Sequence, residues 1–355
     1  MSQSGCERAP EWPKRAYRRA VLQVPPGRVP EEGARSHRDR EGLCEPCSDS
    51  RRPPCSAPPR IRSRQGKLVN GLLTSLLLLT VCGSAAQAGD AAHGQVLFAL
   101  AGGCGCHTPD SGPVGAGGRE IKTPFGTFYG PNITPDRDTG VGDWSDKELI
   151  AAIRDGNSRL GVESPVMPYY QFAGMTDGDA ADLVAYLRTL APVRRENTPS
   201  AVTIPMPRLA YRFWRLLFAS RAARPANVPS EPVARGRYLV QSVAVCTDCH
   251  TPRTRVGAPN RKLYLAGTND GPDGESVPNI TPDSETGIGD WSETHIVHLL
   301  QSGMKPDGDD VEGLMAQVIK GVGGGPGFAS APESELHAIA AYLKTVPPIR
   351  HEIGG

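Results

Sequence analysis

A long internal repeat constrains the fold of this chain more than any other feature. The segment PNITPDRDTGVGDWS from Pro131 recurs as PNITPDSETGIGDWS from Pro278, 147 residues later. Each copy holds a Cys/His element, a Pro/Asn/Trp loop and a closing helix, so we expect two homologous domains, at 89–196 and 233–350, joined by a linker at 197–232. The likeness extends to two further pairs of segments: GCGCHTP from Gly103 with VCTDCHTP from Val245, and AYLRTLAPV from Ala185 with AYLKTVPPI from Ala341.

The repeats have helical patterns. Ser145 with Glu148 forms a capping box ahead of LIAAIR. Alternating strand patterns are scarce, and the 41 Gly and 34 Pro residues fill long loops that need something else to pack on. We therefore expect an all-α, loop-rich fold. The closing segments place apolar residues at the helical spacing, namely Ala180, Leu183, Val184, Leu187 and Leu336, Ile339, Ala340, Leu343.

The second copy holds a CxxCH motif, Cys246-Thr247-Asp248-Cys249-His250. Two thiols one tight turn apart can add across the two vinyl groups of one porphyrin, and the adjoining histidine then reaches the iron as its axial ligand. We expect haem c on Cys246, Cys249 and His250. The alternatives are a structural disulfide and a zinc site, although only three of the four ligands that zinc usually takes are local.

The first copy has only one residue between Cys104 and Cys106 before His107, and Gly103 stands where the motif has its first thiol. We expect a second haem c here, attached through Cys106, with Cys104 as the weaker candidate for a second thioether. The alternatives are a disulfide between the two cysteines and a repeat that has lost its haem.

Spacing within the repeat locates this difference. Gly94 to His107 spans 13 residues, whereas Gly236 to His250 spans 14. The shorter interval indicates a one-residue deletion in the cysteine turn of the first copy.

The sixth iron ligands are expected at equivalent methionines. Trp144 to Met167 is 23 residues and Trp291 to Met315 is 24. A soft thioether suits iron and raises its reduction potential. The alternative for a lone methionine is core packing, which we expect for Met175.

Three other residues compete for the second iron. Met304 lies only 13 residues past its tryptophan and has no counterpart in the first copy, so it ranks below Met315. His295 and His298 would make a bis-His site. Because His295 matches Glu148 in the repeat, we expect it on a solvated helix face.

The PNITPD and GDW loops carry donors for the haem propionates. We expect the side chains of Asn132, Asn279, Trp144 and Trp291 to supply them. For the asparagines, a loop conserved between the copies only for its turns is a fair alternative.

Residues 67–88 have the layout of a secretory signal peptide, with a basic start, an apolar stretch and an AQA ending. We expect cleavage after Ala88 and export to the periplasm; the alternatives are a buried helix, an uncleaved anchor and a lipid on Cys82. Residues 1–66 are rich in Arg and Pro and cannot bury a core, so we interpret them as disordered or as an extension from a misassigned start codon.

Charge and hydropathy exclude two classes of function. Residues 1–67 carry a net charge of +7 and residues 68–355 a net charge of −6. Because an acidic body repels phosphate backbones, we expect no nucleic-acid partner. No apolar run reaches the roughly 18 to 20 residues of a membrane-spanning helix, which excludes an integral membrane bundle.

The linker contains PRLAYRFWRLLFASRAAR from Pro207. This segment, 207–224, predicts an amphipathic helix that packs between the two domains or lies peripherally on a membrane surface. The sequence slightly favours packing between the domains. The apolar positions are Leu209, Phe213, Trp214, Leu216, Leu217 and Phe218, with Arg208, Arg212 and Arg215 nearby.

The order CHTP, PNITPD with TGxGDW, MPY, and AYL with a closing proline resembles the cytochrome c subunits of membrane-associated bacterial dehydrogenases for alcohols, gluconate and related substrates. The resemblance covers 89–350. It implies tandem class I-like cytochrome c domains, each wrapped around a covalent haem with His/Met ligation, here His107 with Met167 and His250 with Met315. This chain departs from the family in having two haem domains where the best-known members have three, no C-terminal amphipathic anchor and a shortened first cysteine pair.

The resemblance implies that a partner dehydrogenase subunit supplies electrons and that a downstream acceptor, quinone or the respiratory chain, takes them. We therefore expect an exported two-haem electron carrier on the outer face of the cytoplasmic membrane, which does not itself transform a substrate. The competing class is a haem enzyme, such as a two-haem peroxidase or a thiosulfate-oxidising cytochrome. Such an enzyme needs an open iron position, and a methionine at equivalent places in both copies argues against one. A third class is a binding module that has lost its first haem.

Overall fold

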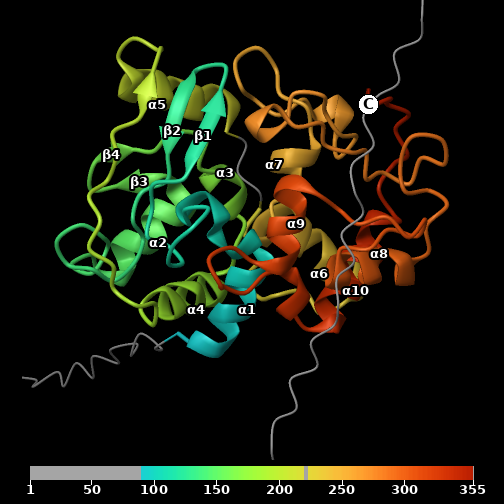
Figure 1. The fold of residues 1–355 in the computed structure, drawn as a ribbon, viewed down its shortest axis with the longest axis horizontal. Helices are drawn as coiled ribbons and strands as arrows, with labels where there is room; N and C mark the ends of the chain where they lie inside the picture. Colours follow the sequence, from blue (N-terminus) through green and yellow to red (C-terminus); the bar gives the residue numbers. More distant parts are fainter. Residues whose placement is uncertain (1–88, 220–222, 355) are drawn as a thin grey trace, which may run out of the picture. The chain divides into compact units, whose positions relative to one another are not determined.

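The computed structural model describes residues 89–219 and 223–354 (Figure 1). All of them belong to one structural unit of the chain, Thr80–Gly355. The predictions for 1–66 and for the signal peptide at 67–88 lie outside the described residues. Below, the first repeat means 89–196 and the second repeat means 233–350.

The first and last helices of the first repeat lie side by side (Figure 1). These are α1 (Ala91–Leu100) and α4 (Asp177–Leu187). A Cβ atom on Gly94 would lie 1.9 Å from the carbonyl oxygen of Asp182, so only glycine permits this approach. The side chain of Asp90 caps α1 by accepting hydrogen bonds from the backbone N–H groups of residues 92 and 93.

The second repeat is built in the same way. Its helices α6 (Pro232–Tyr238) and α10 (Glu333–Leu343) pack together, and a Cβ on Gly236 would lie 1.8 Å from the carbonyl oxygen of Ala338. Gly94 and Gly236 are the two glycines that the repeat aligns. The same close helix crossing therefore occurs twice.

The middle helices of the two repeats begin alike. In α2 (Asp146–Asp155) the Ser145 hydroxyl and the Glu148 carboxylate cap each other's backbone N–H groups, which confirms the predicted capping box. In α8 (Glu293–Ser302) Ser292 and His295 take the same places. His295 is therefore a capping residue.

Short strands correct the prediction of an all-α fold. β1 (Glu120–Thr123) and β2 (Gly126–Tyr129) form an antiparallel hairpin, and β5 (Ala201–Val202) of the linker adds to the far edge of β2. β3 (Asn157–Ser158) and β4 (Gly161–Val162) form a second, two-residue ladder. The β1–β2 hairpin is short, and its third strand comes from more than seventy residues away, so local sequence patterns signal the sheet only weakly.

One hydrophobic core runs through both repeats. Leu97, Phe98 and Leu183 of the first repeat belong to the same cluster of buried side chains as Leu239 and Leu336 of the second. The two repeats therefore share a core, whereas two domains joined only by a linker would each bury their own.

The remaining elements are short, apart from α5 and α9. None of the described helices is both long enough and apolar enough to cross a bilayer. The remaining helices and helical turns are η1 (Gly102–His107), α3 (Tyr169–Phe172), α5 (Pro207–Phe218), η2 (Leu239–Val243), α7 (Thr247–His250), η3 (Arg261–Leu263), η4 (Pro272–Gly274), α9 (Gly313–Lys320) and η5 (Phe328–Ser330).

Candidate haem sites

The CxxCH motif of the second repeat forms one regular helical turn. Cys246 precedes α7 and Cys249 lies within it, three residues on, so the two residues lie on the same side of the turn. The structure contains no disulfide between the two cysteines. Burial raises the pKa of Cys246 to about 12, so this thiol is protonated at neutral pH.

His250 is buried and oriented for metal binding. Its Nδ1 donates a hydrogen bond to the carbonyl oxygen of Pro278 at 2.9 Å. A proton on Nδ1 leaves the lone pair of Nε2 available, and such a carbonyl partner is what orients ligand histidines in metalloproteins. Burial lowers the pKa of His250, which keeps the ring neutral as a ligand must be.

His107 of the first repeat makes the same bond. Its Nδ1 donates to the carbonyl oxygen of Pro131, also at 2.9 Å, and burial again lowers the pKa of the ring. The next residue is equivalent as well, because the hydroxyls of Thr108 and Thr251 each accept a backbone N–H bond at 3.0 Å. The two histidines therefore occupy matching sites.

The one-residue difference between the repeats lies in the first helix and not in the cysteine turn. In the second repeat, Leu239–Val243 forms a π-helical turn, which holds one more residue than an α-helical turn. From the residue that ends each helix, Ala101 or Ala244, the distance to the histidine is six residues in both copies. The predicted deletion in the turn is therefore wrong.

Without that deletion, Gly103 takes the place of Cys246, and Cys104 is one residue out of position. The backbone of Gly102, Gly103 and Cys104 is left-handed, whereas only Val245 is left-handed in the second turn. Cys104 has a φ of 46°, an uncommon value for a residue with a side chain. Cys106 is the only thiol in the first turn that matches its counterpart in the second.

Met167 and Met315 are both half-buried at the edge of the shared core, Met315 in α9 and Met167 just before α3. The other described methionines differ. Met175 is fully buried, as expected for a core residue, and Met304 and Met206 are exposed. Among these methionines, Met167 and Met315 are thus the two that are neither fully buried nor exposed.

The asparagines of the PNITPD loops brace the loops themselves. The amide nitrogen of Asn132 donates to the carbonyl oxygen of Val193 at 2.7 Å and to the Thr139 hydroxyl at 3.2 Å. The amide nitrogen of Asn279 donates in the same way to the carbonyl oxygen of Ile349 and to the Thr286 hydroxyl, which are the equivalent groups of the second repeat. Both amide hydrogens are engaged, so the loop-turn alternative accounts for the asparagines, and the structure does not support the propionate role predicted for them.

The tryptophans lie at the ends of the same loops and are half-buried. Trp144 packs against the core, with the Arg159 guanidinium 5.5 Å from its ring centre. Arg188 donates to the backbone carbonyl of Trp144, and Lys344 does so to that of Trp291. The closing helix of each repeat thus holds its tryptophan loop, and the propionate role of the indole groups stays a prediction.

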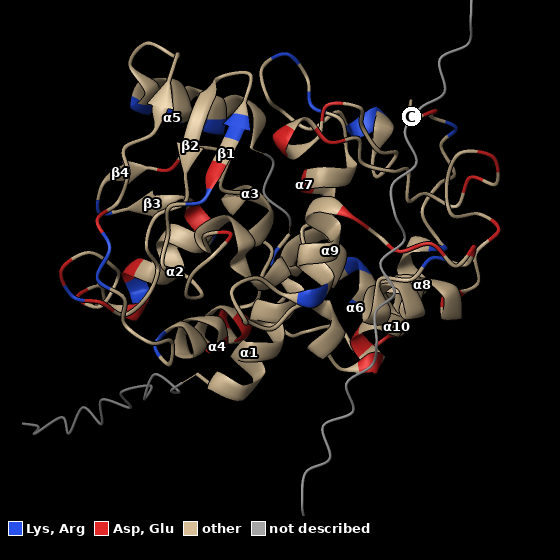
Figure 2. Ribbon diagram, in the orientation of Figure 1, with Lys and Arg blue, Asp and Glu red and all other residues tan. Residues whose placement is uncertain are grey.

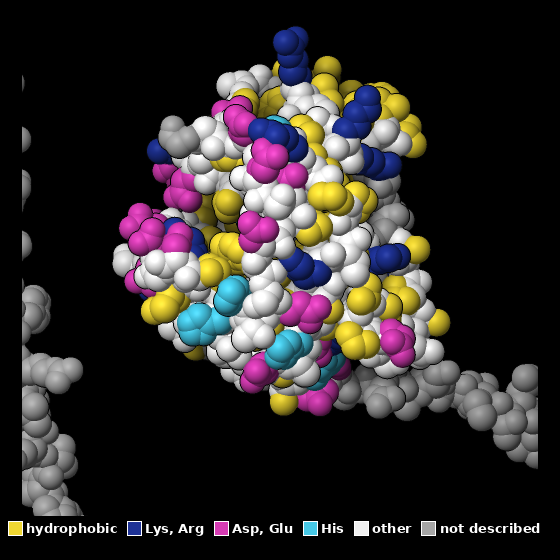
Figure 3. Space-filling model, turned by 90° about the vertical axis from the view of Figure 1, so that its right-hand side faces the viewer, with side chains coloured by type: hydrophobic (Ala, Val, Ile, Leu, Met, Phe, Trp, Pro, Cys, Tyr) yellow, Lys and Arg dark blue, Asp and Glu magenta, His cyan; other side chains and the backbone are white. Residues whose placement is uncertain are grey.

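Two predicted alternatives remain, the histidines of α8 and a zinc site at the CxxCH motif. His295 and His298 are exposed on α8, and Figure 3 shows histidine side chains on the surface of this side of the molecule. Within the described part of the chain, the one cluster of His, Cys, Asp and Glu side chains close enough to share a metal ion is His93, Asp179 and Asp182. It contains no cysteine, which removes the support for zinc at the CxxCH motif.

The residues present therefore fit a covalent haem in the second repeat. They supply two thiols on one side of a turn, a neutral histidine with Nε2 available and a half-buried methionine. The first repeat supplies the same set except for its first thiol.

Comparisons with known proteins agree with this geometry. The cytochrome c family model matches residues 91–191. The chain is 38% identical over 274 residues to a protein named "Diheme cytochrome c-type" from Cereibacter sphaeroides, covering 74% of this chain and 87% of that protein.

Two further relatives are cytochrome subunits of dehydrogenases. The chain is 34% identical to the gluconate 2-dehydrogenase cytochrome c subunit of Pantoea cypripedii, covering 76% of this chain and 64% of the relative. It is also 34% identical to the cytochrome c subunit of the quinone-type alcohol dehydrogenase of Gluconobacter oxydans, covering 78% and 60%. The chain thus spans less than two thirds of the length of these two relatives. The chain belongs to the cytochrome c family, whose members transfer electrons through haem c.

Proposed function

We propose that this protein is an exported two-haem cytochrome c that carries electrons from a partner dehydrogenase to a downstream acceptor, either quinone or the respiratory chain. The observation that carries the proposal is the repeated bond from His Nδ1 to a proline carbonyl, at 2.9 Å in both repeats. The names of the relatives support a dehydrogenase as the electron donor.

The chain's own residues explain how the sites would work. Haem c supplies an iron that gains and loses one electron at a time. His107 and His250 would bind the iron through Nε2, oriented by the Pro131 and Pro278 carbonyls, and Met167 and Met315 would supply its other protein ligands. With both ligands of each iron supplied by the protein, no position would remain open for a substrate, which favours electron transfer over the peroxidase or thiosulfate-oxidising alternative.

The number of haems tests this function directly. The full chain, coexpressed with haem-attachment machinery, should hold two haems per polypeptide by pyridine haemochrome, and the reduced protein should not bind carbon monoxide. One haem per chain would contradict the two-centre carrier. Rapid binding of carbon monoxide would show an open iron and would favour an enzyme.

Export is supported by packing that begins at the proposed cleavage site. The first two residues after Ala88 are already held: Gly89 approaches the backbone of Ala181, and the Asp90 N–H donates to Asp182 Oδ1 at 2.7 Å. N-terminal sequencing of the protein from a periplasmic fraction should therefore read Gly-Asp-Ala-Ala-His. A mature chain that keeps residues of the apolar stretch would instead indicate an uncleaved anchor.

The linker helix α5 bridges the two repeats through one face. Trp214 is buried, its ring centre lies 5.4 Å from that of Tyr170, and its Nε1 donates to the carbonyl oxygen of Val256 in the second repeat at 2.8 Å. Arg215 donates to Asn157 in the first repeat. Packing between the domains, which the sequence slightly favours, therefore accounts for this face of α5 and not for the opposite face.

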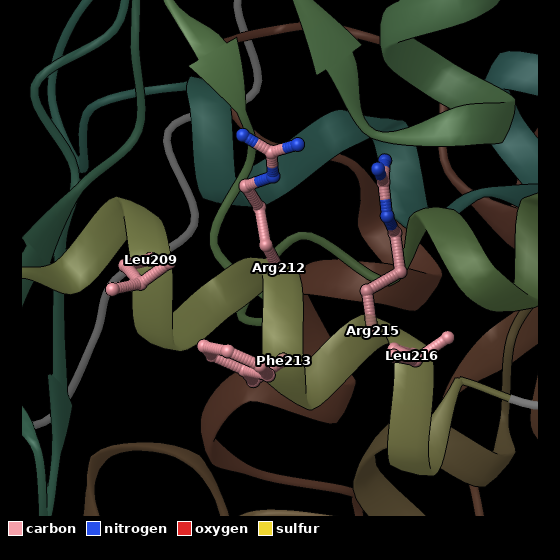
Figure 4. A pocket seen from close by; sticks show the side chains of 5 residues that line it. All are labelled: Leu209, Arg212, Phe213, Arg215 and Leu216. Atoms are coloured by element: carbon pink, nitrogen blue, oxygen red, sulfur yellow. The ribbon is translucent and has the colours of Figure 1, made fainter.

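The opposite face of α5 is apolar and exposed. Leu209, Phe213 and Leu216 are 45%, 57% and 79% exposed, and with Arg212 and Arg215 they line a shallow hollow (Figure 4). The two guanidinium groups extend from the same side of the helix, away from Phe213 (Figure 4). No acidic residue lies in α5, whose charged side chains are all arginines (Figure 2).

This arrangement supports peripheral contact with an anionic membrane surface, with the apolar side chains inserted and Arg212 at the headgroups. Replacing Leu216 by Glu should weaken binding to vesicles with anionic lipid more than tenfold, since burying one such side chain is worth about 1.5–3 kcal/mol. Met304→Glu, at an exposed apolar position in the second repeat, is the matched control. Equal vesicle binding by both variants would contradict the membrane role of α5.

A further inference from the structure

A polar cluster joins the attachment turn of the second repeat to the first repeat. Asp248, between the two cysteines of the CxxCH motif, accepts hydrogen bonds from Gln171 Nε2 at 3.1 Å and from the Tyr170 hydroxyl at 3.3 Å. Thr247 donates to the side-chain oxygen of Gln171. On its own side, the Asp248 carboxylate pairs with Arg253.

These bonds place Asp248 close to elements of both sites. In sequence it stands two residues before His250, and its partners on α3 follow Met167 by only three and four residues. The Asp248 side chain is only 21% exposed, so water screens its charge weakly.

The attachment turn of the first repeat also faces this interface. A Cβ on Gly102 would lie 3.4 Å from Val318, and one on Gly105 would lie 3.6 Å from Val322, both in the second repeat. Gly105 is the residue equivalent to Asp248, because each stands two residues before its histidine. At this position of the two attachment turns, only the second repeat has a carboxylate.

We propose that Asp248 is a shared positioning residue of the two haem sites, whose half-buried carboxylate lowers the reduction potential of both haems. This inference rests on the proposed two-haem function. A negative charge stabilises the oxidised iron, which carries one more positive charge than the reduced iron. Arg253 beside the carboxylate opposes this effect in part, so the pair sets the net charge that both sites experience.

The test is a spectroelectrochemical titration of the haem-loaded full chain. Asp248→Asn keeps the size of the side chain and removes its charge, so the midpoint potentials of both haems should rise while the absorption spectrum stays that of the wild type. Arg253→Gln should lower both potentials. Met167→His and Met315→His identify the two waves, because replacing a methionine ligand lowers the potential of its own haem.

Glu293→Gln, which neutralises an exposed carboxylate at the start of α8, is the control and should shift neither potential. A two-haem Asp248→Asn protein with a wild-type spectrum and an unchanged first-site potential would overturn the inference and leave the proposed function intact. If that variant does not fold, an Arg253→Gln protein with an unchanged first-site potential overturns it instead. A wild-type protein with one haem would end both the shared role and the two-haem function, and the haem count shows this before any titration.

Discussion

Cysteine geometry at the residue scale separates the two haem sites. In the second repeat Cys246 and Cys249 lie three residues apart on a right-handed helical turn, the spacing that suits two thioethers. In the first repeat, Cys104 follows two left-handed glycines and is left-handed itself. Its thiol packs at the edge of the shared core, and burial raises its pKa to about 12.

We therefore expect Cys104→Ser to keep both haems and Cys106→Ser to lose the covalent haem of the first repeat. Pyridine haemochrome of acid-acetone-treated protein measures both, through the haem count and through the band shift of a haem with one thioether. As a control, Cys246→Ser should convert the second haem from two thioethers to one. A change in the first-site band of Cys104→Ser would show that Cys104 is attached.

At the scale of single elements, the helix crossings depend on two glycines. Gly94→Ala would place a Cβ 1.9 Å from the carbonyl oxygen of Asp182, so α1 and α4 must move apart. We expect a loss of about 1–3 kcal/mol in the free energy of unfolding, as for other overpacked interiors. Guanidinium-induced unfolding of the haem-loaded protein measures it.

Gly178→Ala is the matched control for this prediction. Gly178 lies in the first turn of α4, and the nearest atom to its added Cβ would be 4.0 Å away. This substitution should be neutral or stabilise by up to about 1 kcal/mol. A Gly94→Ala protein as stable as Gly178→Ala would show that the helices can separate freely.

The start of α2 predicts a pH dependence. Hydrogen bonds from Arg159, and then from Ser145, lower the pKa of Glu148 from 4.5 to about 2. Because the folded-state pKa is the lower one, the stabilisation is complete above about pH 4.5 and disappears as the pH falls toward 2. The melting temperature of Glu148→Gln should therefore fall less than that of the wild type as the pH is lowered through this range. An equally steep fall in the variant would contradict the low pKa assigned to Glu148.

At the scale of the whole molecule, the shared core leads us to expect that the two repeats unfold as one cooperative unit. The Tyr238 hydroxyl of the second repeat donates to Asp179 Oδ2 at 2.5 Å and accepts the Thr176 N–H at 3.1 Å, both in the first repeat. These bonds are buried, and the core beneath them is continuous. Neither repeat therefore buries its apolar surface without the other.

Tyr238→Phe should cost about 1–3 kcal/mol, because it leaves the buried Thr176 N–H and Asp179 carboxylate without this partner. Unfolding followed by tryptophan fluorescence and by the Soret bands should still show a single transition at a lower midpoint. Tyr211→Phe, on a linker helix that is largely exposed, is a control expected to change little. Two separate transitions in the wild type would contradict the shared core.

The attachment turn of the second repeat, the matching places of the two histidines and the capping box could be predicted from the sequence. These features depend on residues a few positions apart, and the repeat supplied each of them twice. The bond that orients His107 and His250 also follows the repeat, since Pro131 and Pro278 begin the duplicated segment. Local spacing is sufficient wherever a short stretch of backbone sets the geometry.

Only the tertiary structure decided the features that depend on contacts between distant segments of the chain. The extra residue of the second repeat is absorbed by a π-helical turn, and residue counting alone cannot assign it to the helix rather than to the cysteine turn. The amide groups of Asn132 and Asn279 meet partners about 60 to 70 residues away, which left their role open. The sequence by itself thus determined the duplication and the candidate haem ligands, because both are local patterns. The shared core and the place of Asp248 between the sites arise only when the two repeats pack against each other.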